Sequence, residues 1–281
     1  MMLRGRLTTA PLVLALILPL AAADEAREIV RRSVNIGDEN IRAARDYTFR
    51  ERRTGRMLNG SGAVTKTEVE TYDVTLVDGS PYRRLISRDD KPLPSKDERK
   101  EQEKLRKIAE ARRKETPTER EKRIADWDRK RQQERETWRE VVDAFDFRIA
   151  GEDHRDGRAQ YILEALPHPG YKARTRNAGF FPKVKGRIWI DKQDYHWTRV
   201  EAEVIETISF GGILLRLAKG SRLEADQTRV NGEVWLPKRF EAEASARVGL
   251  VKKFRGQMEI TYSEYKKFQT DSRIVATEPL P

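Results

Sequence analysis

Short runs of alternating hydrophobic and polar residues fill the second half of the chain. The clearest are VKGRIWI (184–190), HWTRVEAEV (196–204), EVWLPKRFEAEASARV (233–248) and KFRGQMEITY (253–262). Alternation with a period of two predicts strands that have one apolar face and one polar face. Asp-Gly and Asn-Gly pairs at 78–79, 156–157 and 231–232 predict tight hairpin turns. The pattern therefore predicts an antiparallel meander.

A different spacing marks the residues that precede the first strand. Over 24–46, small and apolar residues recur every three or four positions, which predicts an amphipathic helix. Gly37 is expected to kink or divide it. The stripe is Ala26, Ile29, Val30, Ser33, Gly37, Ile41 and Ala44.

Residues 95–140 interrupt the β pattern with a run dominated by charge, 17 basic and 13 acidic residues. Ser95-x-x-Glu98 and Thr116-x-x-Glu119 match the capping box that begins many helices, and Pro117 suits a first helical position. We predict two helices, 96–114 and 117–145, with the middle of the second in solvent. Two functions remain open for this insertion, a solvated spacer and a docking arm for a partner.

The alternation sorts the later strands into two faces. Arginine, lysine and glutamate occupy one face, and the other presents a row of small residues at Ala242, Ala244 and Ala246. Space above such a row is filled either by a covering helix or by an apolar ligand. The residues predicted to form this apolar, ligand-binding concave face are Ile188, Ile190, Val200, Ala202, Val204, Phe240, Ala242, Ala244, Ala246, Met258, Ile260 and Tyr262.

The N-terminus predicts export. Residues 1–23 combine a basic head, an apolar run and an Ala-Ala-Ala end, the pattern of a signal peptide cleaved before Asp24, with an uncleaved anchor as the alternative. We therefore expect a periplasmic protein. The chain has no cysteine and a formal net charge of +11. In an exported protein this charge favours lipid headgroups or anionic polymers over nucleic acid as partners, although solubility alone also accounts for it.

Catalytic and metal-binding motifs are not found in the sequence. Asp191, Asp194 and His196 lie close together between Trp189 and Trp197, yet their spacing is that of a hairpin turn, in which Asp caps its own backbone. We interpret them as an exposed turn that has no catalytic role. No cofactor and no metal are predicted, and His154 and His168 are interpreted as turn and loop residues.

The order of these segments resembles a known family. A helix running into YTF, a GRIWID…D…RVEAEV hairpin and NGEVWLPKRF after an Asn-Gly turn are similar to the lipoprotein-carrier (LolA/LolB-like) superfamily, in particular its outer-membrane lipoprotein-sorting-like members. The resemblance implies a mainly β (α+β) fold, a strongly curved, half-open antiparallel barrel covered by the N-terminal helix. It implies one domain over 24–281, interrupted by the charged helical hairpin 95–143.

The resemblance also implies a function without catalysis. The expected activity is binding or carrying a lipid or an acylated, lipoprotein-like ligand in the concave apolar face. The alternative is an envelope protein–protein interaction or stress-sensing module that uses 96–140 as a docking arm. Expected partners are a lipid or acylated protein, an envelope protein and, peripherally, a membrane.

Overall fold

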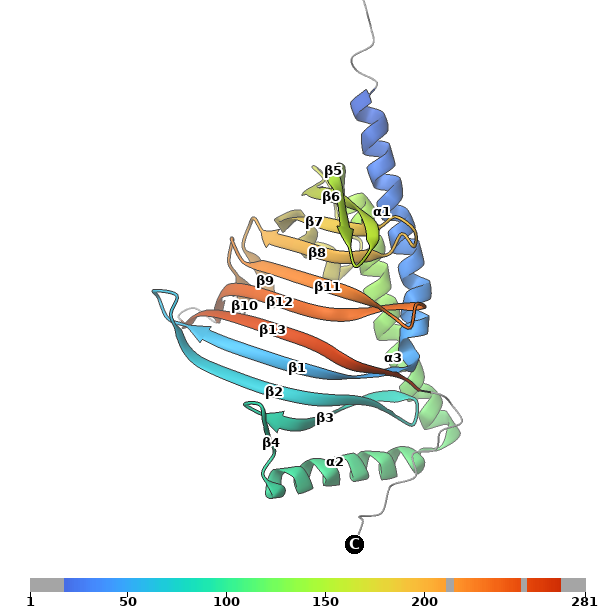
Figure 1. Cartoon of the computed structure of the whole chain (residues 1–281), viewed down its shortest axis with the longest axis vertical. Helices are drawn as coiled ribbons and strands as arrows, with labels where there is room; N and C mark the ends of the chain where they lie inside the picture. The colour runs from blue at the N-terminus through green and yellow to red at the C-terminus, as the bar shows by residue number, and fades with distance from the viewer. Residues whose placement is uncertain (1–17, 211–214, 249–251, 269–281) are drawn as a thin grey trace, which may run out of the picture.

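One curved antiparallel sheet dominates the computed structural model, which describes residues 18–210, 215–248 and 252–268 (Figure 1). Thirteen strands join in the order β4-β3-β2-β1-β13-β12-β11-β8-β7-β6-β5, with β9 and β10 beside β12. In the described chain β4 and β5 are unpaired edges, so the barrel is open. The strands are β1 (Tyr47–Leu58), β2 (Val64–Val77), β3 (Ser80–Arg88), β4 (Lys91–Pro92), β5 (Phe145–Arg155), β6 (Arg158–Pro167), β7 (Val184–Asp191), β8 (Trp197–Val204), β9 (Ile208–Phe210), β10 (Leu215–Leu217), β11 (Arg222–Val230), β12 (Val234–Val248) and β13 (Lys252–Lys267).

The three predicted hairpin turns are confirmed. Both residues of Asp78-Gly79, Asp156-Gly157 and Asn231-Gly232 have positive φ, between 43° and 78°. A two-residue turn of this kind matches the twist of the strands that it joins, and Asp, Asn and Gly tolerate it best. One further strand pairing is long range, since β13, the last strand, pairs with β1, the first.

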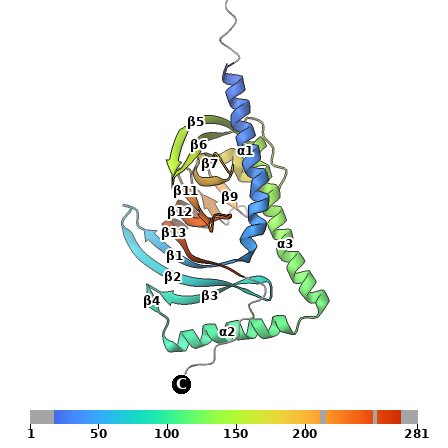
Figure 2. The same cartoon turned by 45° about the vertical axis from the view of Figure 1, so that its right-hand side comes forward.

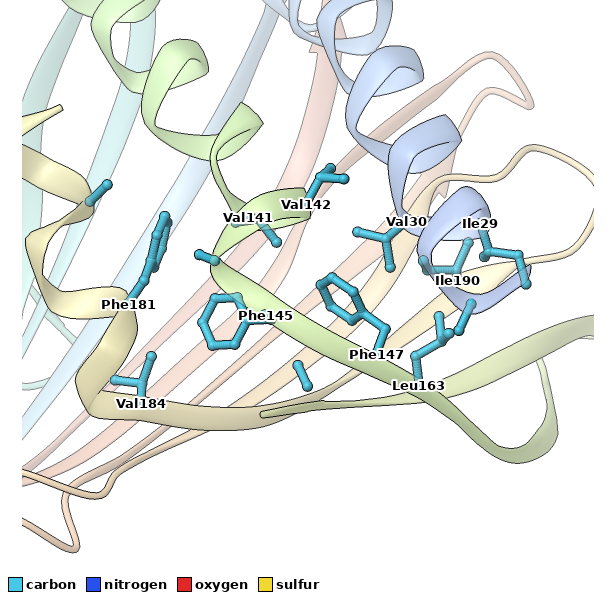
Figure 3. Close-up of a cluster of buried hydrophobic side chains, with 14 of the residues drawn as sticks. Ile29, Val30, Val141, Val142, Phe145, Phe147, Leu163, Phe181, Val184 and Ile190 are labelled. Carbon is cyan, nitrogen blue, oxygen red and sulfur yellow. The ribbon is translucent and has the colours of Figure 1, made fainter. Parts of the chain in front are cut away.

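Helix α1 (Leu18–Ala43) covers part of one face of the sheet, as the amphipathic pattern predicts (Figures 1 and 2). Ala26, Ile29 and Val30 are buried against strand residues such as Phe147, Leu163 and Ile190 (Figure 3). The helix is continuous through Gly37 and ends in a short turn, η1 (Ala44–Asp46). The predicted signal peptide falls mostly on residues outside the described ranges, and its cleavage position lies within α1.

The charged insertion forms helices, as expected, but they diverge from their connection. Helix α2 (Ser95–Arg113) runs near β3, and α3 (Pro117–Arg139) runs up beside α1 (Figures 1 and 2). Glu140 separates α3 from α4 (Val141–Ala144), so the predicted second helix is in two parts. Thr137 is the only described residue of α2 and α3 that is buried.

Arginines fix the connection between α2 and α3, residues 112–123, which we call the elbow. Arg112 Nη1 donates to the carbonyl oxygens of Val77 (2.6 Å) and Ser80 (3.0 Å). Arg123 donates to Ser80 Oγ (2.5 Å) and forms a two-point contact with Glu115 (2.7 Å each). The insertion is therefore attached to the β2–β3 turn and does not project freely from the sheet.

Only one of the two predicted capping boxes forms. Thr116 accepts from the Glu119 backbone while the Glu119 side chain accepts from the Thr116 backbone, as predicted. At the other helix the N-cap is Pro94, and Ser95 is already the first helical residue, so the prediction for Ser95 and Glu98 is wrong. Proline at 94 fixes an extended backbone there, which starts the helix one residue early.

A bilayer needs a helix of roughly 20 apolar residues. No helix within 18–210, 215–248 and 252–268 is both long enough and apolar enough to span a bilayer.

Candidate functional site

The twelve residues of the predicted apolar face come from four strands, β7, β8, β12 and β13. Cross-strand pairs fix which of them share a face, because directly paired residues point the same way. Ile188 pairs with Val200, and Phe240 pairs with Ile260. Ala225 of β11 links the two halves, since it pairs with both Val200 and Phe240. The register therefore brings these residues onto one face, which we call the apolar face.

Part of the apolar face is filled by the chain itself. Ile190 (0% exposed) and Val204 (5% exposed) belong to the core beneath α1 and α4, and Ile188 packs against it. Tyr262 packs edge-on against Phe49, with ring centroids 5.7 Å apart. A ligand cannot reach these positions without displacing a helix or a packed ring, so they serve the core.

Ile260 is also buried (7% exposed), and Val200 and Phe240 are half-buried. Beyond these residues the apolar face is bare. Met57, Leu223, Phe254 and Met258 are between 38% and 42% exposed, and they are four of the eight large hydrophobic residues that stand exposed in the described chain. The pairs Leu223–Ala242, Ala242–Met258, Ala246–Phe254 and Met57–Gly256 place them side by side across β11, β12, β13 and β1. We call this surface the bare strip, consisting of Met57, Ala202, Leu223, Ala242, Ala244, Ala246, Phe254 and Met258.

Because glycine and alanine have small or no side chains, they leave open space above the bare strip. A Cβ atom placed on Gly55, the partner of Met258, would meet no atom within 4 Å, so the space above this position is open. Gly256 is different, because a Cβ there would lie 2.7 Å from the Phe254 ring. Phe254 thus lies across Gly256 and forms one wall. Five of the twelve predicted residues belong to the strip, namely Ala202, Ala242, Ala244, Ala246 and Met258.

The list of predicted site residues lacks Met57, Leu223 and Phe254. Phe254 has the right alternation, while Met57 lies near the end of β1, a strand rich in arginine, and Leu223 is the single large apolar residue in RLEADQ. An isolated apolar residue in a charged strand gives a weak periodic signal. Pairing to neighbouring strands is what shows that these residues extend one surface.

A hollow of about 590 Å³ lies on the opposite, charged face over β6, β7, β8, β11 and β12. Glutamates and basic residues line it, with Arg187 close to Glu164 (3.3 Å) and Lys185 close to Glu203 (3.7 Å). Burial raises the pKa of Glu224, and its acidic neighbours Asp226 and Glu201 add to this. Leu166 and, from the bare strip, Ala202 and Leu223 also border the hollow, but the charged side chains that surround them make this face a poor surface for an acyl chain.

The turn that holds Asp191, Asp194 and His196 is a turn, as predicted, but it is not exposed. Asp191 is 0% exposed and His196 is 2% exposed. Arg158 donates twice to Asp191 (2.6 and 2.7 Å) and once to Asp194 (2.7 Å). Asp191 also accepts the backbone N–H groups of residues 193 and 194, which makes it the cap of its own turn.

His196 lies between two indole rings. Its ring stacks on Trp235 (5.6 Å between centroids, 11° between planes) and on Trp197 (6.0 Å, 18°), and its Nε2 contacts Gln227 Oε1 at 2.7 Å. Burial lowers the pKa of His196 to about 4, against weaker raising effects of Gln227 and the two aspartates. His196 is therefore neutral at pH 7 and enclosed, which suits a structural role.

The Asp191 carboxylate is also held in one protonation state. Burial works to raise the pKa of Asp191, but hydrogen bonds from Arg158 and from two backbone N–H groups outweigh burial and lower it. General acid–base pairs need pKa values near the working pH. A low pKa for Asp191 beside a low pKa for His196 does not provide such a pair. In the described ranges no group of His, Asp and Glu has a metal-binding arrangement.

Comparisons with known proteins give distant likenesses. No family model matches the chain, and no curated protein matches it. Among solved structures, it is similar to a DUF1329 family protein from Desulfovibrio piger (10% identity, TM-score 0.35, 90% of this chain and 95% of that chain covered). It is also similar to a structure described as an outer membrane lipoprotein-sorting protein domain from Vibrio parahaemolyticus (13%, 0.35, 87% and 95%) and to a LolA superfamily protein from Nitrosomonas europaea (13%, 0.29, 87% and 93%).

The names of the second and third of these structures agree with the family that the sequence resembles. The mainly antiparallel, open and helix-covered architecture is likewise the predicted fold class. With identities of 10% to 13% and TM-scores of 0.35 or less, the likenesses carry no argument about function.

Proposed function

We propose that this protein binds the acyl chain of a lipid or of an acylated protein on its bare strip, in the cell envelope and without catalysis. The observation that carries the proposal is the exposure of Met57, Leu223, Phe254 and Met258 on one continuous surface. Large apolar side chains that gather on a soluble surface mark an interaction site.

The shape of the strip favours a narrow ligand. It crosses five strands, β8, β11, β12, β13 and β1, which is about 19 Å at the usual spacing between strands. Alanines at 242, 244 and 246 form its floor, and the open space above Gly55 extends it. Burial of each methylene of an acyl chain contributes about 0.8 kcal/mol. A chain of several methylenes laid along the strip would therefore bind with useful affinity, whereas a broad planar ligand would not be enclosed.

A fluorescent fatty-acid probe tests the proposal. Wild-type protein should bind the probe at micromolar concentration and release it when unlabelled lipid is added. Met258→Lys places a charge in the middle of the strip and should weaken binding at least tenfold, because the ammonium group must stay hydrated. Gln257→Lys adds the same charge on the same strand but on the charged face, and it should bind as wild type does.

Two results would count against the proposal. The first is an absence of probe binding by a folded wild-type protein. The second is equal weakening by Met258→Lys and Gln257→Lys, which would assign the effect to net charge. Circular dichroism of each variant establishes that the sheet is intact.

The envelope location belongs to the same proposal. It is supported by the basic head, the apolar run and the alanines of residues 1–23. Cleavage before Asp24 would leave the buried stripe residues Ala26, Ile29 and Val30 in the mature protein. Cell fractionation followed by N-terminal sequencing should find the protein in the periplasm with Asp24 as its first residue. A cytoplasmic protein that begins at residue 1 would contradict this.

A second candidate function is contact with an envelope protein through 96–140. It is supported by Ile124 on α3, which is 36% exposed, and by the charged surface of α2, which has no buried residue. Crosslinking in cells should then depend on Ile124, and Ile124→Glu should abolish the crosslinked product without altering probe binding. Unchanged crosslinking would remove the support for this candidate.

A further inference from the structure

A basic loop beside the core is not explained by acyl-chain binding. Residues 168–183 contain Lys172, Arg174, Arg176 and Lys183 and no acidic residue. Lys172, Arg174 and Arg176 are exposed. Arg174 pairs with Asp143 (2.9 Å), whereas Lys172 and Arg176 form no ion pair with any residue in the described ranges. The loop therefore presents two cations, Lys172 and Arg176, that no residue of the described ranges neutralises.

A buried carboxylate holds this loop in one shape. Glu140, only 2% exposed, accepts the backbone N–H groups of Arg174 and Thr175 (2.7 Å each) and the Tyr171 hydroxyl (2.5 Å). Burial works against the charge of Glu140, but these hydrogen bonds outweigh it and lower the pKa. The loop continues into η2 (Arg176–Lys183), whose Phe181 is buried in the core. Its cations are thus preorganised and point outward from a rigid base.

An exposed tryptophan adjoins the loop. Trp138, in the last turn of α3, is 58% exposed, the largest value among the exposed large hydrophobic residues of the described chain. One edge of its ring approaches Phe181, with centroids 6.4 Å apart, and Phe180 lies half-buried beside Phe181. An indole that is anchored on one side and open on the other is typical of membrane interfaces.

This surface lies at the end of the sheet where the bare strip also lies. Strand β7 begins at Val184, directly after η2, and Val184 pairs with Val204. The next pairs on the same face are Gly186 with Ala202 and Ala202 with Leu223, which leads into the strip. We call Trp138 together with loop 168–183 the basic rim.

We propose that the basic rim docks on a bilayer surface that contains anionic phospholipid. The unpaired cations Lys172 and Arg176 supply electrostatic attraction to headgroups, and Trp138 supplies an amphipathic ring that inserts at their level. Docking in this way turns the open end of the bare strip toward the membrane. The basic rim and the bare strip share no residue, so membrane docking and acyl-chain binding can be measured and can fail separately.

Vesicle cosedimentation tests the docking. The full-length chain is mixed with phosphatidylcholine vesicles that contain about one third phosphatidylglycerol, or none. Wild type should bind the anionic vesicles and lose binding as salt screens the charges. Since each cation near an anionic surface contributes about fivefold to binding, Lys172→Gln/Arg176→Gln should weaken binding on the order of 25-fold.

The matched control removes two cations elsewhere. Lys96 and Arg99 are exposed on α2, near the other edge of the sheet, and form no ion pair with any residue of the described chain (Figure 1). Lys96→Gln/Arg99→Gln has the same net charge as the rim variant and should bind as wild type does. The apolar N-terminal run is present in all of these proteins and gives them the same background.

A second readout reports on Trp138 directly. Vesicles with brominated acyl chains should quench part of the tryptophan emission of wild type, and Trp138→Phe should lose that part. Three results would overturn the proposal: equal binding to vesicles without phosphatidylglycerol, equal weakening by the rim and α2 variants, or unchanged quenching in Trp138→Phe. The first result would mean that apolar adsorption alone explains vesicle binding. The second would mean that the net charge of the protein explains it.

Discussion

At the scale of single residues, the burial of His196 makes the free energy of unfolding depend on pH. Its pKa is about 4 in the folded protein and about 6.5 in an unfolded chain. The unfolded state therefore binds a proton first as the pH falls. The contribution of His196 is complete above pH 6.5 and is lost between pH 6.5 and 4. By pH 4.5 we expect a loss of about 2 to 3 kcal/mol.

Urea unfolding at pH 7 and pH 4.5 measures this loss. His196→Phe keeps a flat ring between Trp197 and Trp235 but has no group to protonate. The variant should be less stable at pH 7, since Gln227 loses its partner, and it should show a smaller drop between the two pH values. Carboxylates titrate in both proteins and cancel in the comparison. An equal drop in both proteins would show that His196 is not the group responsible.

Asp191 is a second residue whose role burial defines. Asp191→Asn keeps an oxygen for the turn backbone but removes the charge that faces Arg158. Loss of Asp191 leaves Arg158 with Asp194 as its remaining counter-ion, so we expect a free energy of unfolding lower by about 3 kcal/mol, the low end for breaking a buried pair. Asp156→Asn is the control, because Asp156 is an exposed turn residue with positive φ, which Asn also tolerates. Equal stability of the two variants would contradict the buried pair.

At the scale of elements, the elbow between α2 and α3 depends on one arginine more than on its neighbour. Arg123 contacts Ser80, Asp78 and Glu115 with its side chain only 20% exposed, whereas Arg120 makes one exposed contact with Asp78 at 3.5 Å. Arg123→Gln should speed hydrogen exchange in α2 by about 30-fold, since loss of its charged hydrogen bonds should cost about 2 kcal/mol in total. Arg120→Gln should leave it within about fivefold. Similar rates in both variants would argue that the helices hold the elbow without Arg123.

Local signals predicted most of the elements, and long-range contacts explain the exceptions. The hairpin turns and the α3 capping box depend on residues a few positions apart, so the sequence contains them. The register shift between Asp226 and Gln227 does not have such a signal. It turns Leu236 and Val234 to the face opposite Phe240, where they pack with Tyr47 in a second small core. Simple alternation would place them on the face of Phe240, so the local pattern does not predict this second core.

In the candidate site, too, local patterns predicted some features, and long-range packing determined the others. Alternation placed Ala242, Ala244, Ala246 and Met258 on one face, and the register agrees. Which part of that face is covered depends on where α1 and α4 pack, and this is decided by contacts such as those of Val30 and Val142 with the core (Figure 3). The burial of Asp191 and His196 likewise requires Arg158 and Trp235, which are distant in sequence. The sequence of a polar turn does not show that its residues will be buried.

At the scale of the whole molecule, the bare strip spans the pairing between the first and the last strand of the described chain. Strand β1 pairs with β13, and Met57 and Met258 belong to these two strands. A ligand on the strip therefore bridges segments that are about 200 residues apart in sequence, as the register shows. The hairpin of β5 and β6 lies at the far edge of the sheet and has no strip residue.

An acyl ligand should consequently stabilise the molecule unevenly. At a concentration 100 times its dissociation constant, a ligand that binds only the folded state adds about 2.7 kcal/mol of stability, which slows exchange that requires β1 and β13 to separate on the order of 100-fold. Fraying at β5 is local and does not release the ligand, so its exchange should change little. Hydrogen exchange with and without a fatty acid measures both regions. Met258→Lys should remove the protection and Gln257→Lys should retain it. Uniform protection of β5 and β13 would place the ligand elsewhere on the sheet, because only a ligand that spans the β1–β13 junction couples its binding to that pairing alone.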